Sequence, residues 1–305
     1  MLTRSMPARR GTSIIEVVIA MVVGAVVLSL VTTISVRQQR LFTDVTDGVA
    51  LSGQLREAAT ILPIDLRGVS VASRDIREAR DTSIELRATI ASAVVCDTIT
   101  NGLVFSPVDA GASAYASYLT TIDVGDTAWV LTPTDSVDDW QPFRIETVGT
   151  SAPKQCAATG PRLSDSVRAL PRVSIGLSTP PSSLNAAIGT AVRVTRPLRY
   201  SLYRASDGAW YIGEKDWNTS TARFNTIQPV SGPFLPAASG GLTFTYLDTA
   251  GTPIPIPVTD PLAIAAIRVS LRGQTRNVSR VLGSAASTGK RADTTAVTVL
   301  LHNRR

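Results

Sequence analysis

Residues 11–36 read GTSIIEVVIAMVVGAVVLSLVTTISV, and Glu16 is the only charged residue among them. A helix formed by residues 12–36 would be about 37 Å long at the usual rise per residue. This is enough to cross the hydrocarbon layer of a bilayer. We therefore predict that residues 12–36 form a transmembrane helix.

The residues before this helix are basic. Arg4, Arg9 and Arg10 precede it, and no acidic residue accompanies them. By the positive-inside rule, the N-terminus stays in the cytoplasm. Glu16 is unusual in such a segment, because an acid at the centre of a bilayer costs about 2.5–3.5 kcal/mol, and less near the interface. Glu16 therefore needs a partner that offsets this cost.

A basic leader, Gly11 and a glutamate five residues later at the head of an apolar helix resemble the type IV prepilin signal. In that family a membrane-bound prepilin peptidase cuts after the glycine and methylates the new N-terminal amine. The resemblance implies processing between Gly11 and Thr12. Glu16 would then be the fifth residue of the mature chain and would act in subunit assembly.

Further positions agree with this resemblance or depart from it. Ala20, Met21 and Gly24 match the spacing found in minor pilins of the PilW kind. Thr12 replaces the usual Phe or Met of the mature N-terminus, and the apolar run lacks the proline of many major pilins. Two alternatives compete. A secretory signal peptide has an apolar core of about 7–15 residues, which is shorter than this run. A plain membrane anchor has the length but gives no reason for Glu16 or Gly11.

The chain has 305 residues and a formal net charge of +6. Loss of the three leader arginines would bring the charge near +3, which is weak evidence for a polyanionic partner. The two cysteines, Cys96 and Cys156, both follow the predicted span and would lie on its oxidising side. We predict a disulfide between them, with two separate buried thiols as the alternative.

After residue 36 the apolar positions become one-sided, which predicts that the helix continues as an amphipathic helix over residues 37–68. The apolar residues at helical spacing are Leu41, Val45, Val49, Leu55, Ala59 and Leu62. Pro63 is expected to end or kink the helix, with one further turn to Gly68 as a C-terminal cap. The resemblance implies that the first half packs in a fibre core and the second half on the chain's own sheet. A membrane anchor with a helical stalk has the same pattern.

From Thr82 onward the sequence predicts strands and loops. The short β-prone runs are Ser83–Thr89, Ala93–Cys96, Leu103–Phe105, Thr127–Leu131 and Phe143–Val148. Residues 110–117 and 174–189 are rich in small residues and are predicted to be surface loops.

The last third of the chain predicts an antiparallel sheet with one solvated face. Asp207-Gly208 indicates a tight hairpin between two strands. Apolar residues alternate with polar ones near residues 242–246, 267–271 and 297–301. We therefore expect an α+β fold, in which the long helix packs on an antiparallel β-sheet domain over residues 69–305. Residues 241–251 and 267–271 are also similar to the closing strands of PilW-like minor pilins and J-type pseudopilins. Residues 71–190 match neither group.

No set of catalytic or metal-binding residues is recognisable. His302 is the only histidine and is expected on a surface strand. Residues 283–290 superficially suggest a phosphate loop, but the glycine spacing is wrong and Arg291 follows the lysine. Asp135, Asp138 and Asp139 fit no EF-hand, so a solvated loop is the preferred interpretation over a calcium site. The four tryptophans have no basic stripe between them, so we expect core and edge aromatics rather than a stacking platform.

We therefore expect a structural protein, with no cofactor and no enzymatic activity. The resemblance implies a minor pilin or pseudopilin with leader 1–11, held in the inner membrane and later inserted into or priming a type IV pilus-like fibre. The implied partners are prepilin peptidase, other major and minor pilins, and the assembly platform of a pilus or secretion system. The alternatives are a J-type pseudopilin of type II secretion and a membrane-tethered binding module, such as an adhesin or DNA-uptake receptor.

Overall fold

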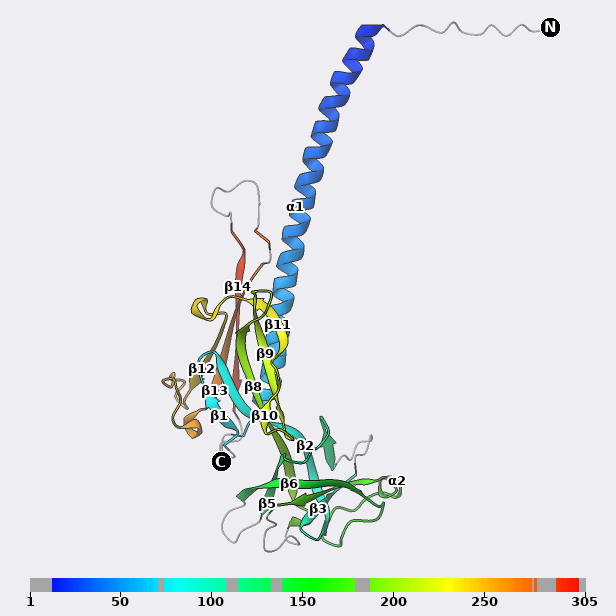
Figure 1. Cartoon of the computed structure of the whole chain (residues 1–305), viewed down its shortest axis with the longest axis vertical. Coiled ribbons are helices and arrows are strands. Elements are labelled where there is room, and N and C mark those ends of the chain that lie inside the picture. Colours follow the sequence, from blue (N-terminus) through cyan, green and yellow to red (C-terminus); the bar gives the residue numbers. More distant parts are fainter. Residues whose placement is uncertain are drawn as a thin grey trace, which may run out of the picture. The chain divides into compact units, whose positions relative to one another are not determined.

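The computed structural model describes residues 13–70, 74–107, 115–132, 139–178, 187–275, 277–278 and 289–301. The chain forms two compact units. The first unit comprises residues 1–52 and 275–291, and the second comprises residues 53–274 and 292–305. One long helix and a large antiparallel sheet dominate the structure, which confirms the predicted α+β class (Figure 1).

Helix α1 (Ile14–Arg67) is a single helix of 54 residues. Its first turn closes on Ser13, whose carbonyl accepts from the amides of Glu16 and Val17. The helix is long and apolar enough to be a membrane span or a signal sequence, and none of its apolar segment is buried. So many exposed Val, Leu and Ile side chains would be unfavourable in water, so an apolar medium or a partner must cover this segment.

Three hydroxyl groups in the apolar half of α1 donate to carbonyls of the helix itself. Ser29 donates to the Val26 carbonyl at 2.8 Å, and Thr33 donates to the Ser29 carbonyl at 2.7 Å. Thr32 donates to the Leu28 carbonyl at 2.9 Å. Hydrogen bonds of this kind let Ser and Thr lie in an apolar medium without unpaired polar groups. These three residues therefore do not interfere with membrane insertion.

In the second unit, α1 buries one face made of Leu55, Ala58, Leu62 and Leu66. This spacing is that of a helical stripe, and it confirms Leu55 and Leu62 as core positions. The prediction was wrong for Leu41, Val45 and Val49, which belong to the first unit and are exposed, and Ala59 is only half-buried. Periodicity identifies an apolar face but does not indicate how much of it the chain's own sheet covers.

The end of α1 follows the prediction in position but not in conformation. The helix continues through Pro63 to Arg67, and the Gly68 amide donates to the Asp65 carbonyl at 3.1 Å. A glycine cap usually has the left-handed conformation, but Gly68 is not among the glycines with positive φ. The bond from Gly68 to Asp65 tightens the last turn instead, and any residue with an amide could make it.

Within its described residues, the second unit contains the strands and the short helices α2, η2 and η3. Their bounds are β1 (Ile76–Ala79), β2 (Ser83–Ile99), β3 (Gly102–Phe105), β4 (Ala116–Tyr118), β5 (Thr127–Thr132), β6 (Asp139–Ser151), α2 (Asp165–Arg168), β7 (Arg172–Leu177), β8 (Ala191–Arg204), β9 (Trp210–Asn218), β10 (Arg223–Phe224), β11 (Gln228–Phe234), η2 (Ala237–Ser239), β12 (Leu242–Leu247), η3 (Pro261–Ala263), β13 (Ala266–Gln274) and β14 (Ala292–Leu300).

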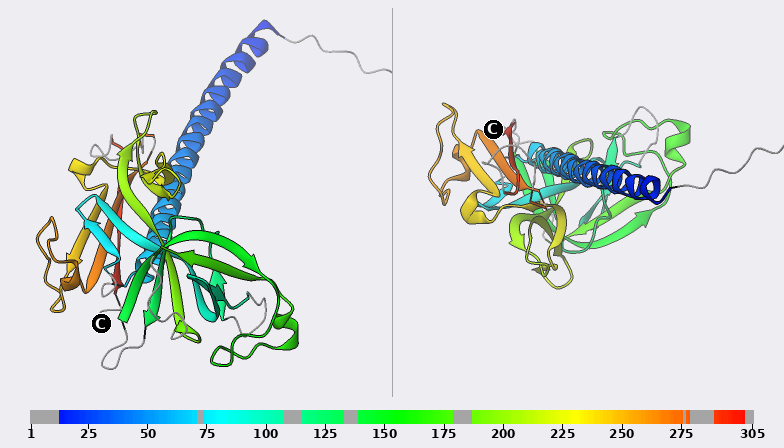
Figure 2. Two further views of the ribbon diagram at one scale, coloured as in Figure 1. Left: turned by 60° about the horizontal axis from the view of Figure 1, so that its bottom comes forward. Right: turned by 90° about the horizontal axis from the view of Figure 1, so that it is seen from above.

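Two long strands, β2 and β8, organise this unit. They pair antiparallel from Ser83 opposite Ser201 to Val94 opposite Ala191, with a bulge after Thr89. At one end, β8 continues the sheet through β9, β11, β13 and β12, and β14 pairs with β13. At the other end, β3 and β4 pair with β2, and β5 pairs with β8. Strands β6 and β7 lie between β5 and β3 in the sheet order. Figure 2 shows these two groups of strands within the unit.

The group of strands β2 to β8 at the far end has its own apolar core. Its buried members include Ile90, Val95, Phe105, Ile145, Ile175 and Val194. The other group buries Phe244, Tyr246, Ile267, Val269 and Leu271 together with the stripe of α1. The middle of the chain, which matched no known pattern, therefore completes the same sheet instead of forming a separate one.

Several strand predictions need correction. Ser83–Thr89 and Ala93–Cys96 belong to one strand, β2, because the bulge lets the chain continue without a turn. Residues 174–177 form part of β7 and are not a loop. Gly176 is small for a packing reason, because a Cβ at this position would collide with the Thr147 hydroxyl. Residues 116–117 belong to β4, and residues 108–114 and 179–186 lie outside the described residues.

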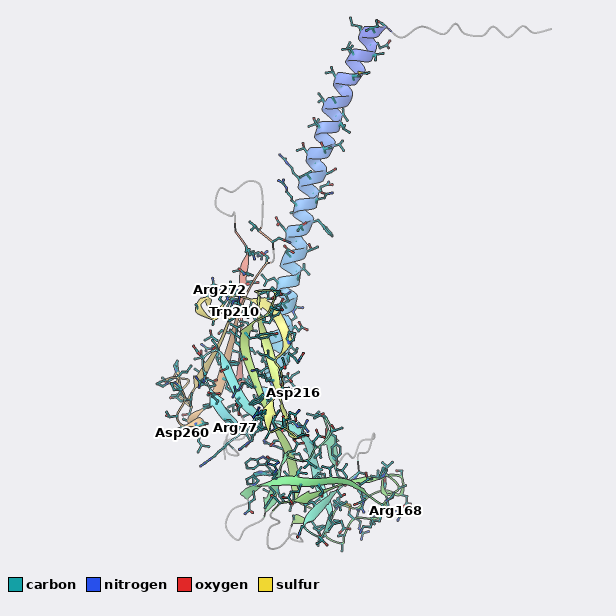
Figure 3. All side chains as sticks on the ribbon, viewed as in Figure 1. Arg77, Arg168, Trp210, Asp216, Asp260 and Arg272 are labelled. Carbon is teal, nitrogen blue, oxygen red and sulfur yellow. A yellow bond between two sulfur atoms is a disulfide. The ribbon has the colours of Figure 1, made fainter. Side chains whose placement is uncertain are left out.

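The C-terminal predictions are confirmed. β8 and β9 form a hairpin across Asp207-Gly208, with Gly208 at φ +79°. β13 pairs with β12 on one side and with β14 on the other. Its inward side chains are buried and Arg268 and Arg272 are exposed, as period-two alternation requires. Trp210 begins β9, and Asp216 lies two residues before its other end (Figure 3).

Candidate functional site

The predicted processing site, Gly11 and Thr12, lies outside the described residues. Glu16 lies in the first turn of α1 and is exposed. Within the described residues, Glu16 takes part in no ion pair. A carboxylate at a helix N-terminus is favoured by the helix dipole, but only by about 0.3–1 kcal/mol.

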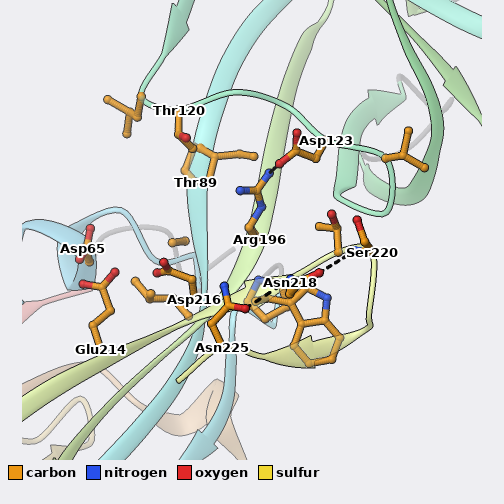
Figure 4. Close-up of a pocket in the computed structure, with 18 residues that line it drawn as sticks. Asp65, Thr89, Thr120, Asp123, Arg196, Glu214, Asp216, Asn218, Ser220 and Asn225 are labelled. Carbon is orange, nitrogen blue, oxygen red and sulfur yellow. Dashed lines mark hydrogen bonds and ion pairs between the residues drawn. The ribbon is translucent and has the colours of Figure 1, made fainter. Parts of the chain in front are cut away.

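A second candidate site is a cavity of about 690 Å³ in the second unit (Figure 4). It is lined by the last turns of α1, by β2 and β8, by the segment before β5, and by β9 with its following turn. The lining residues are Asp65, Ala88, Thr89, Ile90, Leu119, Thr120, Asp123, Val124, Arg196, Pro197, Leu198, Glu214, Asp216, Trp217, Asn218, Thr219, Ser220 and Asn225. The cavity therefore combines apolar side chains with groups that form hydrogen bonds.

Three carboxylates lie at one end of the cavity. The Tyr200 hydroxyl donates to Asp65 and lies 3.0 Å from Glu214 Oε2. Burial, and after it a hydrogen bond with Asp216, raise the pKa of Glu214 to about 7. Burial also raises the pKa of Tyr200, together with its bond to Asp65. Near neutral pH this group of acids therefore holds a proton that isolated carboxylates would release.

Arg196 stands on the opposite wall. Its Nε and one terminal nitrogen both donate to Asp126 at 2.7 Å, in a two-pronged pair. The same nitrogen donates to Asp123 at 2.8 Å and to the Thr121 carbonyl at 3.1 Å. Asp126 is almost fully buried, and its hydrogen bond raises the pKa of Arg196. The guanidinium is thus held rigidly, and its charge is already balanced by two carboxylates.

Trp217 and the turn after it form the third wall. The Trp217 ring meets Phe224 edge to face, with centroids 5.1 Å apart, and Arg199 lies over Phe224 at 4.7 Å. The Asn218 side chain accepts from the amides of Ser220 and Thr221, both at 3.0 Å. This turn and its aromatic pair therefore hold their positions through internal contacts.

No protein-family model, curated protein or solved structure matches this chain. The resemblance of the N-terminal signal to prepilins accordingly stays a prediction, and the cavity has to be interpreted from its own side chains.

The predicted pairing of Cys96 with Cys156 is present in the structure as a disulfide. Both cysteines are buried with Leu163 and Val167 in a small apolar cluster. Arg172 is 2 % exposed and places a guanidinium nitrogen 3.3 Å from Cys96 Sγ. Its other nitrogens donate to the Ala152 carbonyl. The disulfide thus joins β2 to the segment between β6 and α2.

The other residues considered from the sequence are not brought together. His302, Asp135, Asp138 and residues 283–288 lie outside the described residues, and Asp139 begins β6. Among the described residues no group of His, Cys, Asp or Glu could hold a metal ion. Trp129 is buried and donates to Thr195 at 3.0 Å, as expected of a core aromatic.

The cavity itself was not predicted from the sequence. Trp217 was expected to be an ordinary core or edge aromatic, but it lines the cavity. Its flanks, Asp216 and Asn218, follow the ordinary alternation of a half-buried strand, so no local signal distinguishes Trp217 from a core aromatic.

Proposed function

We propose that this chain is a minor pilin, made with leader 1–11 and incorporated into or priming a type IV pilus-like fibre. The proposed topology has a cytoplasmic N-terminus, one span of the inner membrane and a periplasmic β-sheet domain. The observation that carries the proposal is the continuity of α1, whose exposed apolar half contains Glu16 and whose last turns pack in the β-sheet unit. Prepilin peptidase, other pilins and the assembly platform are the proposed partners.

Glu16 is the proposed assembly residue. Cleavage after Gly11 creates a positive amine on Thr12, and methylation keeps that charge. At about 4 Å and an effective dielectric constant near 20, a pair between this amine and Glu16 of a neighbouring subunit is worth roughly 4 kcal/mol before desolvation. This gain is similar in size to the cost of about 2.5–3.5 kcal/mol for placing an acid at the bilayer centre. The charge of Glu16 is therefore poorly compensated in an isolated subunit and is compensated when the subunit docks on its neighbour.

The disulfide supports the proposed compartment. Disulfides persist in oxidising environments such as the bacterial periplasm and are rare in the cytosol. The pair Cys96–Cys156 lies in the second unit, downstream of the apolar half of α1. The proposed topology places this unit on the oxidising side of the membrane.

Processing is tested by expressing the full chain in a host with a prepilin peptidase and measuring its mass. The expected N-terminus is Thr12, carrying an added methyl group. Gly11→Val is expected to block cleavage because it adds bulk at the scissile bond. Gly24→Val is the matched control, since a Cβ at Gly24 meets no atom within 4 Å. Cleavage of Gly11→Val as efficient as that of the control would reject the signal assignment.

Assembly is tested by comparing Glu16→Ala with Glu16→Asp. Both variants should insert and be cleaved, because removing an acid only makes the helix more apolar. Glu16→Ala is expected to lose crosslinking to partner pilins and to reduce fibre number, whereas Glu16→Asp keeps part of both. Normal assembly of the alanine variant would reject the pairing and favour a membrane-tethered binding module. Loss of type II secretion with intact fibres would assign the chain to the pseudopilins.

A further inference from the structure

The cavity in the second unit has the volume of a small-molecule site. About 690 Å³ lies within the range of about 300–1,000 Å³ that ligand pockets occupy. All its walls belong to one compact unit. Figure 4 shows Thr89, Thr120, Asp123, Arg196, Asp216 and Asn225 arranged around a common space. The cavity is thus formed by side chains from distant segments that the sheet brings together.

The charges of the cavity exclude one class of ligand. Asp65, Asp123, Glu214 and Asp216 line it, and Arg196 is the basic residue among the lining side chains. Arg196 is already bound by Asp126 and Asp123. An anionic ligand would meet like charge with no free cation to offset it, which is unfavourable in a partly buried site. The ligand is therefore neutral or positively charged.

The hydrogen-bonding groups favour a ligand with many hydroxyl groups. Carboxylates accept hydrogen bonds through both oxygens, and the hydroxyls of Thr89, Thr120 and Ser220 both accept and donate. Asn225 adds an amide, which offers both kinds of group. A set of this composition surrounds alcohols better than it surrounds an apolar molecule, because each buried polar group would otherwise lose water without replacement.

Trp217 supplies an apolar surface at the same place. Phe224 meets its ring edge to face, and Arg199 in turn stacks on Phe224. The indole is thus fixed before any ligand arrives, so binding loses little side-chain entropy. A sugar ring has one face of C–H groups and an edge of hydroxyls, and it matches an aromatic wall beside hydrogen-bonding groups.

We propose that this cavity binds a neutral or amino-bearing saccharide residue. Trp217 packs against the C–H face of the sugar ring. Asp123 and Asp216 accept hydrogen bonds from its hydroxyl or ammonium groups, and Asn225 and Thr120 complete the contacts. This assignment does not depend on assembly into a fibre, because every lining residue belongs to the β-sheet unit and its adjoining helix turns.

The experiment applies the full chain, held in a zwitterionic detergent without a sugar headgroup, to an array of neutral, amino and uronic acid oligosaccharides. Binding to neutral or amino sugars, and not to uronic acids, is expected. Trp217→Ala should weaken that binding at least tenfold. Trp210→Ala is the matched control, because Trp210 lies at the other end of β9 and does not line the cavity (Figure 3). Thermal melts verify that both variants remain folded.

A second arm separates a sugar from a simple cation, using a lysine-containing peptide as probe. The peptide is expected to compete poorly with the bound saccharide. Four results would overturn the proposal: no bound saccharide, binding of uronic acids alone, equal losses in the two tryptophan variants, or tight binding of the lysine peptide in place of the sugar. If Trp217→Ala does not fold, quenching of tryptophan fluorescence by the array sugars is compared between the wild-type chain and Trp217→Phe. Equal quenching by the sugars in the wild-type chain and in Trp217→Phe would also overturn the proposal.

Discussion

The Tyr200 hydroxyl donates a hydrogen bond to Asp65, so that strand β8 holds the last turn of α1 by a polar contact as well as by apolar packing. Glu214 lies 3.0 Å from the same hydroxyl, on the neighbouring strand β9. A hydroxyl has one proton to donate, so it cannot donate to two carboxylates at once. Burial nevertheless raises the pKa of Glu214, although its hydrogen bond with Tyr200 lowers it. The helix end and the cavity wall thus share one hydrogen-bonded cluster.

Replacing Tyr200 tests this cluster. Tyr200→Phe keeps the ring but leaves Asp65 and Glu214 without the hydroxyl, which should destabilise the chain by about 1–3 kcal/mol. Urea denaturation followed by circular dichroism measures the change. Tyr203→Phe is the control, because Tyr203 lies on the same strand and is only partly buried. Equal stabilities of the two variants would contradict a structural role for the Tyr200 hydroxyl.

The raised pKa of Glu214 predicts a pH dependence of stability. Its pKa is about 7 in the folded chain, against an ordinary value of 4.5. Between these values the unfolded chain has released this proton and the folded chain retains it. The contribution of Glu214 is therefore fully present below pH 4.5, falls as pH rises towards 7, and stays lost above 7.

Glu214→Gln should remove this part of the pH dependence, because glutamine keeps a hydrogen-bond donor and does not titrate. Relative to the variant, the wild-type chain should lose about 1 kcal/mol between pH 5 and pH 8, after allowance for solvent screening of a half-exposed group. Thermal melts across this range measure the difference. Glu146→Gln, at an exposed position of β6, should leave the wild-type profile unchanged. The prediction fails if both variants follow the wild-type curve.

Breaking the ion pair between Arg196 and Asp126 should cause a larger loss of stability than the changes at Tyr200 and Glu214. Asp126 is 1 % exposed, and Arg196→Met would leave its carboxylate buried without a counter-ion. Removing one partner of such a pair typically costs about 3–5 kcal/mol. Arg168→Met is the comparison, because the side chains of Arg168 and its partner Asp165 are both exposed, and exposed ion pairs contribute about 0–1 kcal/mol. Adding Asp126→Asn to Arg196→Met should recover part of the loss. Chemical denaturation that ranks Arg168→Met as the more harmful change would contradict this account.

The parts of the fold that were predictable have local causes. The apolar composition of residues 14–36 indicates a long helix, and Asp207-Gly208 indicates a hairpin, because each depends on neighbouring residues only. The errors arose where distant chain segments decide. Gly176 is in a strand because β3 and β6 approach it closely, and Leu41 is exposed because the buried stripe belongs to later turns. The cavity could not be predicted for the same reason, since Asp65, Asp123 and Asp216 meet only in the folded sheet.

The disulfide gives the last prediction. Cys96 and Cys156 are 60 residues apart in sequence, and closing a loop of this length reduces the entropy of the unfolded chain. On the chain-entropy model this stabilises the folded state by about 4 kcal/mol. For a domain of this size, such a loss lowers the melting temperature by roughly 8–16 °C. After reduction, the buried Arg172 guanidinium lies beside two thiols and can still donate to the Ala152 carbonyl.

The measurement is the melting temperature of the full chain with and without a reductant, with a thiol assay to verify that the bond has opened. Cys96→Ala combined with Cys156→Ala should melt at the temperature of the reduced wild-type chain in both conditions and should not respond to the reductant. This control separates the disulfide from any general effect of the reducing agent. An unchanged melting temperature in the wild-type chain, with both thiols free by the assay, would show that the cross-link does not stabilise this fold. A chain made in the reducing cytosol is expected to behave like the double variant, because its two cysteines would remain unpaired.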